Sequence, residues 1–157
     1  MSETAKRLEE LGVILPKPPA PAANYGPFAR AGTLLFISGQ LSFGADGKLA
    51  ERHTGKLTPE SALDPAREAA RLCVVNVLAQ AREALGDLDR VAQVVRLGGF
   101  FNVASSFDAL PQAMNGASDL IADLFGAKGR HARNTVGVSH IPLNALAVVE
   151  AVFEIKP

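Results

Sequence analysis

The sequence predicts an α+β protein, a two-layer sandwich in which two long helices cover one face of a mixed sheet. Three observations lead to this prediction. Short apolar runs bounded by glycine lie near both ends of the chain, two longer segments have helical apolar periodicity, and the order is strands, helix, strand, helix, two strands. The 157 residues, of which 48% are hydrophobic and 20% charged, suit a single domain spanning residues 1–157.

Residues 1–24 are expected to form an N-terminal helix and a proline-rich arm outside a core of residues 25–157. Ser2 opens a short charged helix that ends near Gly12. The segment PKPPAPAANYGP that follows holds five prolines and favours an extended conformation. Because the part before it is too short to fold alone, we expect this arm to lie over the body of the domain.

Strands are expected in FARAG (28–32) and TLLFISGQLSF (33–43), and a long helix after them. Two signals for the start of this helix remain open, Thr58-Pro59-Glu60 and Asp64-Pro65. Its apolar stripe runs to Leu85, where Gly86 ends it.

The second half of the chain repeats the alternation of strand and helix. RVAQVVRLGGFFNVA (90–104) is expected as a strand with a bulge or a close approach at Gly98-Gly99. Ser105-Ser106 is expected to cap a helix over residues 107–125. Two strands then close the chain on either side of HIPLN (140–144).

Composition and motifs exclude several classes of function. Sixteen basic and sixteen acidic residues cancel, and aromatics make up only 6%, so no nucleic-acid partner is expected. The single Cys73 lies in an apolar helical pattern, and the three histidines lack ligand spacing, so no metal is expected. Dinucleotide, phosphate-loop and serine-elbow motifs are missing from the sequence, so no cofactor is expected.

The expected cellular location rests only on the lack of membrane and signal segments in the sequence. No run of 18 apolar residues occurs, and the start, MSETAKRLEELG, is too charged for a signal peptide. The expectation is a cytoplasmic protein without a membrane partner.

Arg133 is the residue that most suggests a binding site. In a strand over residues 134–138, alternate side chains face opposite sides, and the set that begins at Asn134 is the apolar one, expected beneath the helices. Arg133 would then stand on the other face, where its guanidinium can bind a carboxylate or phosphate through two hydrogen bonds. The alternative is an ordinary cross-strand ion pair with Glu150.

The order of several short motifs resembles the RidA family, also called YjgF or endoribonuclease L-PSP, whose members are reactive-intermediate deaminases. The matching segments are YGPF (25–28), FISGQLS (36–42), DPA (64–66), NGASDL (115–120), HARNTVGV (131–138), IPLN (141–144) and VEA (149–151). The similarity covers residues 24–154, and the proline-rich arm and the GASDL helix resemble a distinct branch of the family.

The resemblance implies a chorismate-mutase-like fold, assembled as a homotrimer with ligand clefts between neighbouring subunits. It also implies that Arg133 clamps the carboxylate of a small 2-imino or enamine acid while water attacks the C=N carbon, which gives a 2-keto acid and ammonia. By position in the motifs, Ser38 and Asn115 match further catalytic residues. The substrate-binding positions would be Phe28, Gly39, Arg133, Thr135 and Glu150.

Three residues differ from the family pattern. Phe28 stands where the family has a tyrosine, Thr135 where it often has a cysteine, and Val148 where it has the glutamate that positions water. Glu150 lies two positions later, on the same strand face. These differences leave a second hypothesis, a non-catalytic trimer that binds or senses a small carboxylate. A ribonuclease, which the older family name suggests, is less favoured because the chain is neutral and poor in aromatics.

Overall fold

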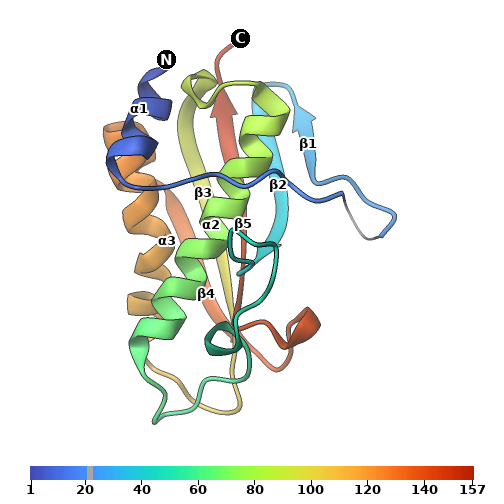
Figure 1. Cartoon of the computed structure of the whole chain (residues 1–157), viewed down its shortest axis with the longest axis vertical. Coiled ribbons are helices and arrows are strands. Elements are labelled where there is room, and N and C mark those ends of the chain that lie inside the picture. Colours follow the sequence, from blue (N-terminus) through green and yellow to red (C-terminus); the bar gives the residue numbers. More distant parts are fainter. Residues whose placement is uncertain (21–22) are drawn as a thin grey trace.

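One mixed five-stranded sheet organises the protein, in a computed structural model that describes residues 1–20 and 23–157 (Figure 1). The strands lie in the order β1-β2-β5-β3-β4, in which only β3 and β4 pair in parallel. Their bounds are Phe28–Ala31 (β1), Leu34–Leu41 (β2), Val91–Asn102 (β3), Ala132–Val138 (β4) and Ala147–Ile155 (β5). The α+β prediction is thereby confirmed.

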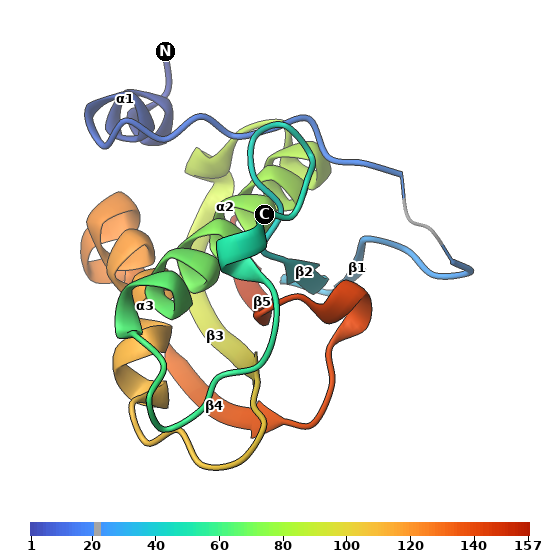
Figure 2. The ribbon, with the colours of Figure 1, turned by 60° about the horizontal axis from the view of Figure 1, so that its bottom comes forward.

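Two long helices, α2 (Leu63–Leu85) and α3 (Leu110–Phe125), cover one face of this sheet (Figures 1 and 2). The alanine-rich stripe of α2 is fully buried, as its helical periodicity predicted. The backbones of α2 and α3 come very close at Gly116, where a Cβ atom would lie 2.0 Å from the Arg67 carbonyl oxygen. The opposite face of the sheet is not covered by any helix of the described residues, and we call it the open face.

The N-terminal helix α1 (Glu3–Glu10) packs beside α3, and the chain then crosses over α2 (Figure 1). Ser2 caps α1 with its side chain. Leu15, in the segment that crosses α2, is buried, and its carbonyl accepts a hydrogen bond from Arg82 at 3.2 Å. Pro21 and Ala22 of the predicted proline-rich arm lie outside the described residues. The segment around Leu15 therefore packs on the body of the domain, whereas residues 23–26 of the arm are exposed.

One of the two open starts for α2 agrees with the structure, whereas the predicted start of α3 needs correction. α2 begins at Leu63, beside the Asp64-Pro65 signal, whereas Thr58 belongs to a turn closed by a hydrogen bond from its N–H to Ser61 Oγ. α3 begins at Leu110 and not at residue 107, and neither Ser105 nor Ser106 caps it. The physical reason is that the Phe107 ring is buried ahead of the helix, residues 108–109 form a turn, and Pro111 then fixes the first helical turn.

The predicted orientation of β4 is wrong. Arg133 points toward α3, where its guanidinium is hydrogen bonded, so that Asn134 and Val136 lie on the open face. The prediction assumed that the valines must face the core, but β4 is an edge strand and Val136 remains 40% exposed. On the helix-covered face, Gly137 lies so close to Val103 that a Cβ atom would be 2.8 Å from that side chain.

Gly98 and Gly99 mark close approaches rather than a bulge. A Cβ atom at Gly99 would lie 2.3 Å from Met114 Sδ on the helix-covered face, and one at Gly98 would lie 2.9 Å from Glu150 on the open face. The register shifts of β3 occur earlier, between Val91 and Gln93 and between Val94 and Arg96. Within the described ranges, none of the helices is both long and apolar enough to cross a membrane.

Candidate functional site

Arg133 is held at the edge of the sheet by three hydrogen bonds to α3. Its Nη1 donates to Asn115 Oδ1 at 2.8 Å and to Ser118 Oγ at 3.0 Å, and its Nη2 donates to the Pro111 carbonyl at 3.1 Å. Asn115 and Ser118 are three residues apart in the helix and therefore share a face. All three acceptors are neutral, and Arg133 forms no ion pair with any residue of the described chain.

The unused part of the guanidinium is the part that can bind an anion. Arginine has five N–H donors, and three of those of Arg133 are used within the chain. Both Nη1 hydrogens have acceptors, so Nε–H and one Nη2–H remain without a partner among residues 1–20 and 23–157. Such a pair of donors on one guanidinium suits the two oxygens of a carboxylate.

His131 extends this network. Its Nε2 lies 2.9 Å from Ser118 Oγ, and its Nδ1 lies 2.6 Å from the Gly129 carbonyl oxygen. The His131 side chain is half-buried and hydrogen bonded at both ring nitrogens. Four side chains are thus connected in this order: Asn115, Arg133, Ser118, His131.

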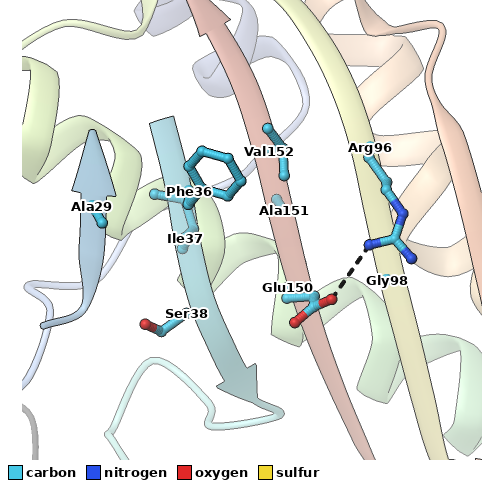
Figure 3. Close-up of a pocket in the computed structure, with 9 residues that line it drawn as sticks. All are labelled: Ala29, Phe36, Ile37, Ser38, Arg96, Gly98, Glu150, Ala151 and Val152. Atoms are coloured by element: carbon cyan, nitrogen blue, oxygen red, sulfur yellow. Dashed lines mark hydrogen bonds and ion pairs between the residues drawn. The ribbon is translucent and has the colours of Figure 1, made fainter. Parts of the chain in front are cut away.

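A separate cavity of about 390 Å³ lies on the open face (Figure 3). Phe36 and Val152 form its apolar side, while Arg96 and Glu150 form an ion pair of 3.4 Å across β3 and β5. Arg96 also donates to Asn134 Oδ1 at 2.8 Å. Gly98 gives this cavity its depth, because a side chain there would meet Glu150.

The sequence-predicted site residues fall into two sets on opposite faces of the sheet. Arg133, Asn115 and Thr135 belong to the side that α3 covers, whereas Ser38 and Glu150 line the open-face cavity. The sheet therefore separates the predicted carboxylate clamp from the other predicted polar residues within one chain.

The remaining predicted residues have structural contacts of their own. Ser38 Oγ donates to the Gly26 carbonyl at 2.8 Å, and a Cβ atom at Gly39 would lie 3.0 Å from Val148. Phe28 is half-buried against the core and pairs with Ile37 of β2. Thr135 Oγ1 is buried without a hydrogen-bond partner in the described chain.

The expected alternative for Arg133, an ion pair with Glu150, is wrong. β4 pairs with β3 and not with β5, and Arg133 and Glu150 lie on opposite faces. Arg96 takes Glu150 instead. The sequence analysis missed Arg96 and Ser118. The three-residue spacing of Asn115 and Ser118 places both on one helix face, and this spacing is the signal that would have indicated Ser118.

Other reactive groups offer no second centre. Burial raises the pKa of the Cys73 thiol far above its ordinary value, although backbone hydrogen bonds act in the opposite direction, so this cysteine is inert. No group of three or more His, Cys, Asp or Glu side chains suited to a metal occurs in the part of the chain that the structure describes.

Comparison with known proteins agrees with this architecture. Residues 5–155 match the model of the family described as "YjgF/chorismate_mutase-like, putative endoribonuclease". Protein TCP17 of Trypanosoma cruzi is 42% identical over 153 residues, which cover 97% of this chain and 94% of TCP17.

Solved structures extend the likeness to three dimensions. Atu1372 of Agrobacterium tumefaciens, described as a protein of unknown function, is 42% identical with a TM-score of 0.87, covering 98% of this chain and 94% of that chain. A protein from Shewanella oneidensis described as "a putative endoribonuclease" is 36% identical with a TM-score of 0.91, covering 97% and 99% of the two chains. With a family match over nearly the whole chain, this protein belongs to the YjgF/RidA family, which has the chorismate-mutase-like fold.

Proposed function

We propose that this protein hydrolyses small 2-imino or enamine carboxylic acids to 2-keto acids, with release of ammonia. Arg133 would clamp the substrate carboxylate, in a cleft between the subunits of a homotrimer. The observation that carries the proposal is the Arg133 guanidinium, which α3 holds through neutral acceptors only and which keeps two N–H donors unused.

The charge of the site supports this assignment. A carboxylate of the protein beside Arg133 would neutralise the guanidinium. The acceptors present are instead neutral: Asn115, Ser118 and the Pro111 carbonyl orient the guanidinium and leave its full positive charge for a ligand. The first turn of the 16-residue helix α3 lies beside the same guanidinium, and its positive end favours a bound anion further.

The reaction needs little from the protein beyond orientation of the substrate and of one water molecule. Water adds to the C=N carbon, the nitrogen takes up protons, and the C–N bond then breaks to leave the 2-keto acid and ammonia. Free imines already hydrolyse in water, so holding the carboxylate and placing one water molecule accelerates the step. Under this proposal Arg133 and Asn115 hold the substrate, and polar groups near Ser38 or Glu150 place the water.

A site shared between subunits would bring the two sets of residues together. Within one chain the sheet separates Arg133 from Ser38 and Glu150. The open face is also suited to a neighbour, because Phe36 and Val136 stay 43% and 40% exposed on it. A second subunit packed against this face would cover these side chains and could complete the cleft.

A second function, carboxylate binding without turnover, is favoured by one specific observation. Val148 stands on the open face at the family's glutamate position, so an apolar side chain replaces the group that would position water. A homotrimer of this kind would sense or sequester a small acid. An endoribonuclease is not favoured, because sixteen basic and sixteen acidic residues give no net attraction for RNA.

The deciding experiment releases a 2-imino acid in situ and follows its capture by semicarbazide. An amino-acid oxidase acting on L-alanine generates 2-iminopropionate, which semicarbazide captures faster than it captures pyruvate, so faster hydrolysis lowers the initial rate of semicarbazone formation. We expect the wild-type protein to lower this initial rate and Arg133→Ala to abolish the effect. Arg30→Ala is the matched control, because it removes an exposed arginine for which no ion pair is found in the described chain.

Two other outcomes have definite meanings. If the wild type does not affect trapping but binds pyruvate in an Arg133-dependent manner, the protein is a carboxylate-binding trimer. If it neither accelerates hydrolysis nor binds pyruvate, the carboxylate-clamp proposal is wrong for acids of this size.

A further inference from the structure

Ser118 and His131 are two polar residues that the proposed reaction does not use, yet both lie in the Arg133 network. Ser118 Oγ lies 3.0 Å from Arg133 Nη1 and 2.9 Å from His131 Nε2, and His131 Nδ1 lies 2.6 Å from the Gly129 carbonyl oxygen. Both side chains are half-buried. The three hydrogen bonds form a chain from the Arg133 guanidinium to the backbone at the end of the 3₁₀ turn Gly126–Gly129.

The chemistry of these groups assigns every hydrogen in the line. The Gly129 carbonyl only accepts, so His131 Nδ1 carries a hydrogen, and arginine only donates, so Ser118 Oγ accepts from Arg133. With neutral His131, Nε2 is then an acceptor, and the Ser118 hydroxyl donates its hydrogen to it. The hydroxyl is thereby locked with its lone pairs toward the guanidinium.

We propose that Ser118 and His131 are positioning residues, which hold Arg133 in the orientation that presents its Nε and Nη2 donors to a carboxylate. The inference rests on the proposed function of Arg133 as a carboxylate clamp. Ser118 acts by occupying the second Nη1 hydrogen, and His131 acts only through Ser118, because it fixes the rotation of the hydroxyl. Neither residue contacts the ligand.

The alternative is that the pair merely stabilises the packing of α3 on β4, and four variants separate the two roles. Ser118→Ala removes the acceptor, His131→Ala frees the hydroxyl, the third variant combines both changes, and Ser118→Thr restores the hydroxyl. Ser106→Ala is the matched control, since Ser106 is exposed and its side chain forms no hydrogen bond within the described ranges. Thermal unfolding confirms that each variant is folded.

The first measurement is the Kd for pyruvate, a probe that carries the carboxylate and resembles the expected products. We expect Ser118→Ala to raise this Kd about ten-fold, the change in affinity typical of one lost bond to a charged group. His131→Ala should raise it about three-fold, and the double variant should match Ser118→Ala alone, because effects along a single path are not additive. Ser118→Thr should bind nearly as well as the wild type.

If the protein proves to be a deaminase, Ser118→Ala, His131→Ala and the double variant should raise KM and leave kcat nearly unchanged. The carboxylate is held equally in the ground state and in the transition state, so its loss is a loss of uniform binding. A general loosening of α3 would lower kcat as well.

Two results would overturn the inference and leave the clamp itself intact. One is a Ser118→Ala variant that binds pyruvate with the same Kd as the wild type. The other is a double variant whose fold-change in Kd equals the product of the two single fold-changes. A wild type that neither accelerates imine hydrolysis nor binds pyruvate contradicts the proposed function, and the positioning role is then decided by ¹⁵N NMR of the arginine side chains. Faster rotation of the Arg133 Nη1 group in Ser118→Ala than in Ser106→Ala supports positioning, and equal rotation rejects it.

Discussion

Thr135 has a buried hydroxyl without a hydrogen-bond partner in the described chain, on the same face of β4 as Arg133. A buried hydroxyl that lacks a partner has lost its hydration without compensation. We therefore expect Thr135→Val, which keeps the shape of the side chain, to increase the free energy of unfolding by about 1 kcal/mol. Urea denaturation of the ligand-free protein measures this, and a decrease would show that the hydroxyl has a partner.

The contacts of single residues were the least predictable part of the site. The sequence analysis named both Arg133 and Asn115, and the structure joins them by a hydrogen bond of 2.8 Å from Nη1 to Oδ1. It placed Arg133 on the wrong face, because alternation along a strand groups the side chains but does not say which group meets the helices. Val136 is apolar and yet exposed, so apolar content does not show which side of this edge strand faces the core. A further subunit can cover the exposed side of an edge strand.

At the scale of elements, Asp89 connects α1 to the rest of the chain. Its carboxylate accepts hydrogen bonds from the backbone N–H groups of Glu3 and Thr4 and from the Thr4 hydroxyl, at 2.7–2.9 Å. Burial alone would raise the pKa of Asp89. The hydrogen bonds from Thr4 and Glu3, together with the nearby Lys156 ammonium, outweigh burial and lower this pKa below its ordinary value of 3.8.

The docking of α1 should therefore depend on pH. Because the folded-state pKa of Asp89 is lowered, its stabilising contribution is complete above the unfolded value of about 3.9 and is lost as the pH falls through the lower folded value. NMR signals of the Glu3 and Thr4 amides should shift cooperatively below about pH 4. Asp89→Asn should remove this transition and destabilise α1 by about 1 kcal/mol. Unchanged amide shifts in that variant would contradict the assignment.

The contact between α2 and α3 makes a second prediction at this scale. Replacing Gly116 by alanine gains about 1 kcal/mol of helix propensity. The new Cβ atom would lie 2.0 Å from the Arg67 carbonyl oxygen, which belongs to a helix backbone and cannot move aside locally. Forcing the helices apart costs about 1–3 kcal/mol or more, so the net effect should be destabilising. Gln112→Ala, at an exposed position of α3, is the control and should be neutral or stabilising in urea denaturation.

Helices and strands were better predicted than their starts. The α2 stripe and the five strands follow from apolar periodicity, which the core requires. The start of α3 was misplaced by three residues because Ser105-Ser106 is a local capping signal. The burial of Phe107, a tertiary contact, determines the non-helical path of the chain there instead. The parallel pairing of β3 with β4 likewise depends on how α3 crosses over, which no local pattern records.

The whole molecule should be a trimer, with a mass in solution of about 50 kDa for three chains of 16.5 kDa. A charge on the open face should break it apart, because Phe36 and Val136 would lie between subunits. Val136→Glu should therefore sediment as a monomer in analytical ultracentrifugation. Val95→Glu is the comparison variant and should weaken the trimer less. Val95 is also partly exposed but does not line the cavity. A wild type that sediments as a monomer would remove the shared cleft from the proposal.

If the cleft is shared, two inactive proteins should restore activity when they are mixed. Arg133→Ala lacks the clamp, and Glu150→Ala lacks an acid on the opposite face of the sheet, so each subunit supplies what the other has lost. In trimers unfolded and refolded as an equal mixture, roughly one quarter of the interfaces combine two intact sides. Imine hydrolysis should recover to about that fraction of the wild-type rate. Recovery requires that residues from opposite faces of two different sheets act together. No recovery, with both single variants inactive and mixed trimers verified by mass spectrometry, would contradict a cleft shared between subunits.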